Sequence, residues 1–352
     1  MKDENKPVRS TRRRIILITV CVILGLFFAA LLFATAYVHH LLSLIKITDD
    51  SYLYATLSSE QLEALQSDPD YDPNFTGPSI TPDQVPVNTI PSAPKEEWQD
   101  EDIINIMLIG DDTRQPQIRQ RSDAMILCSF NVKTNTLTMI SFLRDTYIPQ
   151  IPGFWADKLN AAYAYGGIQT MDETFVSYFG VDIDAHVIVQ FDGFKGVIDM
   201  LGGVDIELTE AEVNHLNSIK HRDLTVGMNH LNGEEALAYS RIRKIDMDAR
   251  RAQRQRTVIT ALINAYKSKS VTEMLTLTSK ILESGFIQTD MTSAEVLDYV
   301  SNLFPKLKTT TINNLQIPAD GTYESMTVGN ITATKVCDFD ANRKLLQDVL
   351  QP

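Results

Sequence analysis

The sequence predicts one large α/β domain that a single N-terminal helix anchors in a membrane. Three observations carry this prediction: an uncharged apolar run at residues 15–38, a Pro-rich segment after it, and strand-like apolar runs that alternate with helical segments over residues 97–352. A domain of this length fits one sheet covered by helices. We therefore expect a basic tail (1–14), a transmembrane helix (15–38), a stalk and linker (39–96) and a globular domain (97–352).

The apolar run is long enough to span a bilayer. It holds no Asp, Glu, Lys or Arg over 24 residues, and about 20 apolar residues cross the hydrocarbon core as a helix. The tail carries six Lys and Arg against two acids, which keeps the N-terminus in the cytoplasm and the large domain outside the cell. A cleaved signal peptide is the alternative, because Ala34-Thr35-Ala36 resembles a cleavage site, but signal cores have only about 7–15 apolar residues. We expect an uncleaved, single-pass cell-membrane protein.

The segment after the anchor has the composition of a tether. Residues 39–66 are typical of a helical stalk, whereas residues 67–94 hold seven prolines and almost no apolar periodicity. Pro-rich chains of this kind form extended spacers rather than cores.

Composition excludes some classes of function. Without the tail's charges, the chain's 32 Lys and Arg and 45 Asp and Glu fall to 26 and 43, a net charge of −17 for residues 15–352. So acidic a chain argues against nucleic acid as a partner. The sequence contains no HExxH and no CxxC, so a zinc enzyme is not favoured. Cys128 and Cys337 would form either a disulfide or two buried free thiols, and we favour the thiols.

Apolar runs predict the strands of the domain. Residues 103–109, 124–130 and 137–143 are expected to form three consecutive strands, with a turn at 131–136. A fourth strand is expected at 185–191.

Capping signals predict the helices. Thr170 and Glu173 form a capping box, which predicts a helix that begins there and ends at Gly180. Asn232 is expected to begin a short helix. Further helices are predicted at 248–268, 272–282, 293–304 and 341–350.

Three polar clusters flank the first three strands. Residues 110–114 follow the first strand, residues 121–123 precede the second, and Arg144-Asp145 follow the third. In an up-down-up meander all three clusters lie on one edge of the sheet, where converging acids and arginines favour a functional site. Charged solvent-facing loops are the alternative for each cluster alone.

An arginine-rich run lies at residues 241–256, with six Arg in 16 residues of an acidic domain. Arg251, Arg254 and Gln255 are spaced to share one face of a helix. Arginine suits bidentate contacts to phosphate. The run therefore has two interpretations, a site for a polyanion such as pyrophosphate or a solvated basic face, and the acidic composition around it favours the polyanion. Asp112 and Asp123 offer the oxygen donors that Mg²⁺ prefers, and the sequence has no Walker loop.

Several motifs, in matching order, resemble the LytR-CpsA-Psr (LCP) proteins of the bacterial cell envelope. The resemblance covers about residues 105–265, and the short basic tail and single span are also similar. The matching segments are 108–114 (LIGDDTR), 121–125 (RSDAM), 140–147 (ISFLRDTY), 158–163 (KLNAAY), 165–167 (YGG), 201–205 (LGGVD), 231–244 (LNGEEALAYSRIRK) and 251–255 (RAQRQ).

The resemblance implies a three-layer α/β/α fold with a central mixed sheet and a hydrophobic pocket for a polyprenyl tail. It implies a phosphotransferase that moves a glycopolymer from a polyprenyl-pyrophosphate carrier to peptidoglycan, with Mg²⁺ (or Mn²⁺) held by Asp112 and Asp123. The implied catalytic residues are Asp112, Arg121, Asp123 and Arg144, and we expect a carboxylate, Asp112 or Asp145, to activate the acceptor hydroxyl as a base. The implied pyrophosphate ligands are Arg121, Arg144, Arg241, Arg243, Arg251, Arg254 and Gln255.

This sequence departs mildly from the family pattern. Leu143 stands where proline is common, Ala124 where threonine is common, and Arg250 where glycine is frequent. None of these changes removes a charged site residue.

The apolar residues of a pocket can be interpreted in two ways. Nine of them could line a lipid pocket or pack in the core, and core packing is favoured for any single one. They are Phe175, Val176, Phe179, Val187, Val189, Phe191, Phe194, Val197 and Leu201.

The sequence leaves two other functions open. A polyprenyl-pyrophosphate phosphatase would use water in place of the glycan acceptor. A non-catalytic envelope regulator would bind the lipid pyrophosphate without turning it over. The expected partners are the lipid-linked glycan donor, the peptidoglycan acceptor and membrane lipid, with no nucleic acid.

Overall fold

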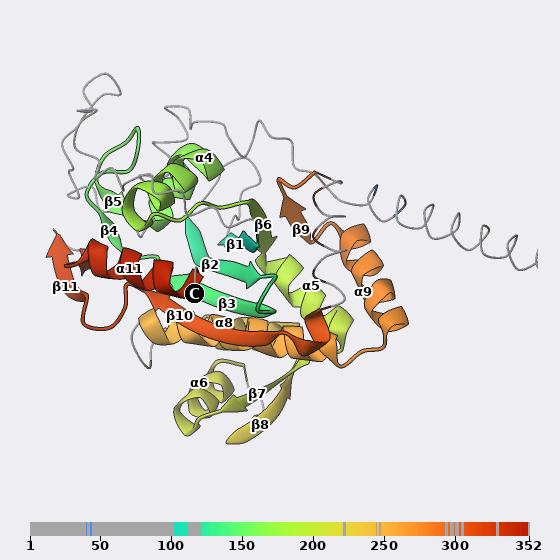
Figure 1. The fold of residues 1–352 in the computed structure, drawn as a ribbon. Coiled ribbons are helices and arrows are strands. Elements are labelled where there is room, and N and C mark those ends of the chain that lie inside the picture. The colour runs from blue at the N-terminus through green and yellow to red at the C-terminus, as the bar shows by residue number, and fades with distance from the viewer. Residues whose placement is uncertain are drawn as a thin grey trace, which may run out of the picture. The chain divides into compact units, whose positions relative to one another are not determined.

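The structure is a computed structural model that describes residues 102–111, 121–220, 223–243, 248–292, 306–328 and 331–350, with residues 40, 43, 245, 295, 299 and 303 (Figure 1). The predicted span at 15–38 and Asp112 lie outside these residues, as does all of the stalk and linker except residues 40 and 43. Among the described residues, no helix is long and apolar enough to cross a membrane. The chain divides into two units, 1–45 and 46–352, and the second contains the globular domain.

A six-stranded mixed sheet forms the centre of the domain, with strand order β10-β3-β2-β1-β6-β9. The first three strands pair antiparallel along the chain, which confirms the predicted meander. β6 runs parallel to β1 and β10 runs parallel to β3, whereas β9 is antiparallel to β6. The strands are β1 (Ile103–Asp111), β2 (Ser122–Asn131), β3 (Thr136–Phe142), β6 (Ala185–Gln190), β9 (Ile287–Thr289) and β10 (Thr311–Ile317).

Helices cover both faces of this sheet, so the predicted α/β/α layering is confirmed (Figure 1). On one face α4 packs on β2 and is itself covered by α11, while α5 and α8 pack on the other face. The helices are α4 (Asn160–Phe179), α5 (Phe191–Leu201), α6 (Glu210–Lys220), α7 (Gly233–Ser240), α8 (Asp248–Lys267), α9 (Val271–Ser284), the 3₁₀ helix η2 (Leu307–Thr309) and α11 (Phe339–Leu350).

Among the described residues, three pairs of antiparallel strands lie outside the central sheet. We call each pair a hairpin, although helix α6 connects β7 and β8. They are β4–β5 (Tyr147–Ile148 and Asp157–Lys158), β7–β8 (Val204–Leu208 and Gly227–Leu231) and β11–β12 (Tyr323–Val328 and Ile331–Val336). The β7–β8 hairpin packs on α8, and β12 contacts β4.

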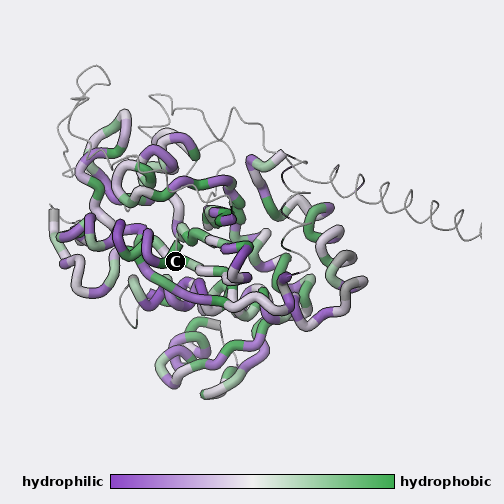
Figure 2. Tube along the Cα trace, viewed as in Figure 1, coloured by the Kyte–Doolittle hydropathy of each residue, from purple (hydrophilic) through white to green (hydrophobic). Residues whose placement is uncertain are grey.

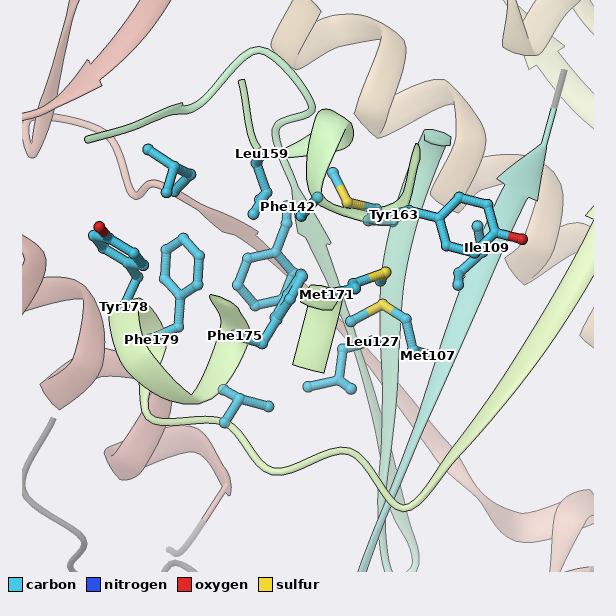
Figure 3. Packing of buried hydrophobic residues seen from close by; sticks show 14 of the residues in the cluster. Met107, Ile109, Leu127, Phe142, Leu159, Tyr163, Met171, Phe175, Tyr178 and Phe179 are labelled. Atoms are coloured by element: carbon cyan, nitrogen blue, oxygen red, sulfur yellow. The ribbon is translucent and has the colours of Figure 1, made fainter. Parts of the chain in front are cut away.

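The main core fills the space between the sheet and α4 (Figure 3). Met107 and Leu127 from the strands meet Met171 and Phe175 from the helix, and all four are fully buried. Because side chains alternate across a strand, the intervening residues of β1 and β2 face the opposite layer. A second core joins α5, α6, α7, α8 and the β7–β8 hairpin.

The α4 helix begins ten residues earlier than the capping box predicted. It starts at Asn160 and continues past Gly167, whose φ of 70° introduces a kink rather than an end. Thr170 is therefore inside the helix, where its carbonyl accepts a hydrogen bond from Thr174 Oγ1 at 2.6 Å. The predicted end at Gly180 is confirmed, since this residue adopts the left-handed conformation.

Other local predictions had mixed outcomes. Asn232 does begin α7, and it forms a reciprocal capping box with Glu235. The fourth strand stops at Gln190 because Phe191 begins α5. Cys128 and Cys337 are free thiols, but Cys337 is exposed, so the prediction that both are buried was wrong. The predicted helix at 293–304 lies largely outside the described residues.

Candidate functional site

The sheet face opposite α4 borders an apolar cavity of about 270 Å³. Strands β1, β2 and β6 form one wall, and helices α5, α7 and α8 close the other. Its apolar lining includes Leu108, Ile126, Val187, Val189, Phe191, Phe194, Val197, Leu237, Ile259, Leu262 and Ile287. Leu108 and Ile126 of this lining alternate with Met107 and Leu127, which pack against α4.

Polar side chains line one part of this cavity. They are Asp123, Ser240, Arg241, Arg243, Arg251 and Gln255, and they come from β2, α7, the turn after α7, and α8. All of them except Ser240 were predicted from the sequence as site residues, and the fold brings them together from distant parts of the chain.

Asp123 is the acidic centre of this group. Its Oδ1 atom accepts a hydrogen bond from Arg144 Nη1 at 2.6 Å and lies 3.4 Å from Arg243 Nη2. The side chains of Asp123 and Arg144 are only 20% and 12% exposed, so the charge-assisted contact between them is shielded from solvent. The start of β2 and the end of β3 thus share one edge of the sheet, as the meander predicted.

Asp145 lies behind Arg144 and binds a second cation. Its Oδ1 atom is 2.8 Å from Lys158 Nζ, and its Oδ2 atom is 3.7 Å from Arg144 Nε. Burial disfavours the ionised carboxyl, but the charges of Arg144, Lys158 and Arg251 outweigh this and hold the pKa of Asp145 below its usual value. The site therefore fixes Asp145 as an anion that positions cations.

Arg121 forms a separate buried cluster. Its two terminal nitrogens donate to both oxygens of Asp157 at 3.2 and 2.9 Å, and Nη1 also reaches Asn160 Oδ1 at 3.4 Å. Tyr165 donates a short hydrogen bond to the same carboxylate. Burial and the charge of Asp157 raise the pKa of Tyr165, so its hydroxyl stays protonated as a donor.

Sequence reasoning missed Asp157 and Lys158 as partners of the site. Both lie in β5, a two-residue strand with no apolar period to mark it. The one signal was that Lys158 and Asn160 fall within a matching segment, residues 158–163, to which no chemical role was attached.

The α7–α8 region supplies the remaining cations. Arg241 stacks its guanidinium over the Phe191 ring, 4.3 Å from the centroid. Arg251 is 4% exposed and lies close enough to lower the pKa of Asp145. Arg251 and Gln255 are four residues apart on α8, and both line the cavity.

Arg254 lies elsewhere, although it was predicted as a pyrophosphate ligand. It does not line the cavity. Its Nε donates to Glu212 Oε1 at 2.7 Å, and its Nη1 donates to the carbonyl of Ile242. Arg254 therefore ties α8 to α6 and to the turn that carries Arg241 and Arg243.

Five of the nine apolar residues considered for a lipid pocket line the cavity, and the other four do not. Phe175 and Phe179 are fully buried in the core beside α4, and Val176 is exposed. Leu201 is buried without lining the cavity. The cavity is lined by Val187, Val189, Phe191, Phe194 and Val197.

A magnesium ion would need oxygen donors at the cavity, and Asp123 fits this requirement. In the part of the chain that the structure describes, the contacts of Asp123 use Oδ1, which leaves Oδ2 as a donor for a hard cation. No group of three His, Cys, Asp or Glu able to hold a metal alone occurs among the described residues. Mg²⁺ is commonly held by one or two carboxylates together with phosphate oxygens of a substrate.

The fold and the cavity define a class of protein. An apolar cavity with arginines in its lining, enclosed between the sheet and its helices in an α/β/α sandwich, suits an apolar ligand with an anionic group. The chain belongs to the LytR_cpsA_psr family, whose model matches residues 76–344. This confirms the resemblance found in the sequence motifs.

The chain is also similar to named proteins and to solved structures. The polyisoprenyl-teichoic acid–peptidoglycan teichoic acid transferase TagU of Bacillus anthracis is 32% identical over 223 residues, which cover 62% of this chain and 70% of TagU. The structure of TagT bound to LIIa-WTA is 28% identical with a TM-score of 0.58, covering 71% of this chain and 90% of that one. The structure of the LytR-CPS2A-psr family protein YwtF (TagT) with bound octaprenyl pyrophosphate lipid is 25% identical with a TM-score of 0.56, covering 75% and 96%.

Proposed function

We propose that this chain is a phosphotransferase that moves an anionic or secondary wall glycopolymer, such as a teichoic acid, from a polyprenyl-pyrophosphate carrier to peptidoglycan. The observation that carries the proposal is the apolar cavity with Asp123, Arg241, Arg243 and Arg251 in its lining. The cavity thus offers both an apolar wall for a polyprenyl chain and cations for a pyrophosphate. The relatives named as teichoic acid transferases support the same reaction class.

The reaction exchanges one phosphorus–oxygen bond for another. A hydroxyl of the acceptor glycan attacks the sugar-side phosphorus, a new O–P bond forms, and the bond to the polyprenyl phosphate breaks. The polyprenyl phosphate leaves with the bonding electrons, so negative charge builds at the pyrophosphate. Arg144, Arg243 and Arg251 would stabilise this charge. Electrostatic stabilisation by preorganised groups is usually the largest single contribution to catalysis.

The proton of the acceptor hydroxyl needs a carboxylate. Asp112 and Asp145 are the two candidates from the sequence. Asp145 is held as an anion by Arg144 and Lys158, and a carboxyl with a lowered pKa is a poor proton acceptor at neutral pH. We therefore assign the positioning of Arg144 to Asp145, and Asp112, which is also a proposed magnesium ligand, is the other candidate for the base.

The divalent cation is part of the same proposal. Asp112 and Asp123 would hold Mg²⁺ (or Mn²⁺), which would neutralise pyrophosphate oxygens when bound. Arg121, bound to Asp157, would approach the phosphate from the neighbouring edge.

The proposed topology matches this chemistry. Residues 15–38 would anchor the chain as a single-pass cell-membrane protein with a cytoplasmic tail at 1–14. The tether at 39–96 would let the extracellular catalytic domain, 97–352, reach a carrier that stays in the outer leaflet. Cysteine-accessibility labelling of intact cells tests this, since a label at residue 337 without lysis is expected and protection from it would contradict the orientation.

Arg144→Ala is the decisive variant for the activity. The purified full chain in detergent would receive a radiolabelled lipid-linked donor, peptidoglycan and Mg²⁺. We expect the variant to lose about 100-fold or more in transfer rate, as removing one donor to a developing charge does. Arg144→Lys should recover part of it, because the charge remains but the guanidinium that reaches both Asp123 and Asp145 is lost. Normal transfer by Arg144→Ala would refute the assignment.

The products separate the alternatives. A ligase yields label on peptidoglycan, whereas a phosphatase yields only free phosphorylated polymer. A non-catalytic binder retains the lipid with no product. Lys133→Ala is the matched control, because this exposed cation pairs with Asp102 at the opposite end of β1 and its loss should leave the rate unchanged.

A further inference from the structure

A second groove follows the other flank of α8. Two adjoining cavities of about 370 and 450 Å³ share Gln253, Arg256 and Asn314 in their linings. The β7–β8 hairpin borders one cavity and β10 borders both, and in Figure 1 α8 lies between these elements. From Ala249 to Asn264 the groove follows α8 for about 22 Å, at 1.5 Å per residue.

The groove and the apolar cavity use different faces of the same helix. Arg251, Gln255 and Ile259 face the apolar cavity, whereas Gln253 and Arg256 face the groove. The first half of α8 is strongly hydrophilic along its length (Figure 2). Among the described residues, none lines both compartments, so the groove is a separate feature.

Arg256 is the unusual residue of this groove. It is 8% exposed, and its Nε and Nη1 atoms are buried with no hydrogen-bond partner among the residues that the structure describes. No described carboxylate forms an ion pair with it. A buried guanidinium keeps its charge, and an uncompensated buried charge is costly. Such a residue is suited to bind an anionic group of a ligand.

The groove begins beside the proposed reaction site. Arg250 lines it, and the next residue, Arg251, lines the apolar cavity. Along β10, Ile317 accepts a hydrogen bond from Leu143 N at 2.9 Å, and Leu143 directly precedes Arg144. A polymer lying in the groove would therefore end within reach of the site where the phosphoryl group is transferred.

The remaining lining suits hydroxyl-rich ligands. It offers amides from Gln253, Asn264 and Asn314, a hydroxyl from Thr260, and the carboxylates of Asp205, Glu207 and Asp320. Amides, hydroxyls and carboxylates are the groups that exchange hydrogen bonds with sugar hydroxyls.

We propose that this groove binds an anionic glycan, with Arg256 as the ligand of its carboxylate or phosphate group. The groove's role rests on the proposed function, because a glycopolymer transferase must hold a glycan beside its lipid site. Two glycans carry the required anion. The acceptor has a free lactyl carboxylate on those muramic acid residues that carry no stem peptide, and a teichoic-acid-like donor polymer has phosphodiesters.

Direct binding to the full chain in detergent tests this without any turnover. The probes are an N-acetylglucosamine–N-acetylmuramic acid oligosaccharide, the same oligosaccharide with its carboxylate amidated, and a glycerol phosphate oligomer. We expect one of the two anionic probes to bind. Arg256→Gln should weaken that probe about tenfold or more, as loss of a hydrogen bond to a charged group does, and should leave octaprenyl pyrophosphate binding unchanged.

The probes identify the source of the anion. Carboxylate-dependent binding that Arg256→Gln abolishes assigns the groove to the acceptor, and phosphate-dependent binding assigns it to the donor polymer. If neither anionic probe binds, or if Arg256→Gln binds both as the wild type does, the proposal is wrong. Loss of lipid binding or of transfer in the wild type would instead contradict the proposed function.

A second variant tests the groove independently if Arg256→Gln does not fold. Asn314→Ala changes an exposed side chain of β10, and we expect it to weaken the same probe several-fold. The acid and amide probes on the wild type give an independent measure of the role of charge. Lys308→Gln, an exposed cation on η2 outside both cavities, is the control and should bind the probes normally.

Discussion

His186 predicts a pH dependence of stability that can be measured. This β6 residue is 2% exposed and lies between two carboxylates: Nδ1 is 2.7 Å from Asp290 Oδ2 and Nε2 is 2.9 Å from Asp172 Oδ1. Burial alone would lower the pKa of His186, but the two carboxylates raise it to about 9. The imidazolium thus joins α4, β6 and the residue after β9, next to the strand positions that line the apolar cavity.

The sign and size of the effect come from linkage between proton binding and folding. The unfolded chain has an ordinary histidine pKa of 6.5, so between pH 6.5 and 9 the folded state binds the proton more tightly. The stabilisation is complete below pH 6.5 and is lost as pH rises through 9. At about 1.4 kcal/mol per pH unit, it amounts to about 3 kcal/mol.

Chemical denaturation of the full chain in detergent, followed by tryptophan fluorescence, provides the assay. Between pH 6 and pH 9.5 we expect the wild type to lose about 3 kcal/mol more free energy of unfolding than His186→Gln does. His215→Gln, on α6, is the matched control and should keep the wild-type pH dependence. Equal pH dependence in the wild type and His186→Gln would show that the buried imidazolium does not stabilise the fold.

Three further predictions address the cavity, the packing and the thiols. Val189→Trp should fill the cavity and weaken octaprenyl pyrophosphate binding about tenfold or more, equivalent to about 1.4 kcal/mol, with tight binding as the contrary result. Gly233→Ala would place a Cβ against the carbonyl oxygen of Lys195, well inside van der Waals contact, so unfolding by denaturant should show a loss of about 1–3 kcal/mol. Cys128 is half-buried and burial raises its pKa to about 12, so mass spectrometry should find a thiol reagent on exposed Cys337 well before it appears on Cys128.

The local part of the fold was predictable because it depends on neighbouring residues. Continuous apolar runs marked β1, β2 and β3, and the short turn between β2 and β3 forced an antiparallel pair. The clusters at Asp123 and Arg144 then had to meet at one edge, and their contact at 2.6 Å agrees with that geometry.

The non-local part was not predictable from single residues. β10 pairs with β3 across 175 positions, and nothing in its mixed sequence indicates the partner. The alternation of apolar residues in β6 did not reveal that Val187 and Val189 face a cavity, while the phenylalanines of α4 pack in a core. Arg254 shares a helical spacing with Arg251, yet Glu212 from α6 holds it away from the cavity.

The two faces of the central sheet differ in their roles, since one packs the core and the other borders the cavity. The face toward α4 is packed with Met107, Leu127, Phe142 and their partners, whereas the face toward α8 borders an apolar cavity. Substitutions on the hollow face therefore alter the ligand while the packed face maintains the free energy of unfolding. A lineage built on this sheet can change which ligand its cavity accepts by drift at a few cavity positions, with the scaffold unchanged.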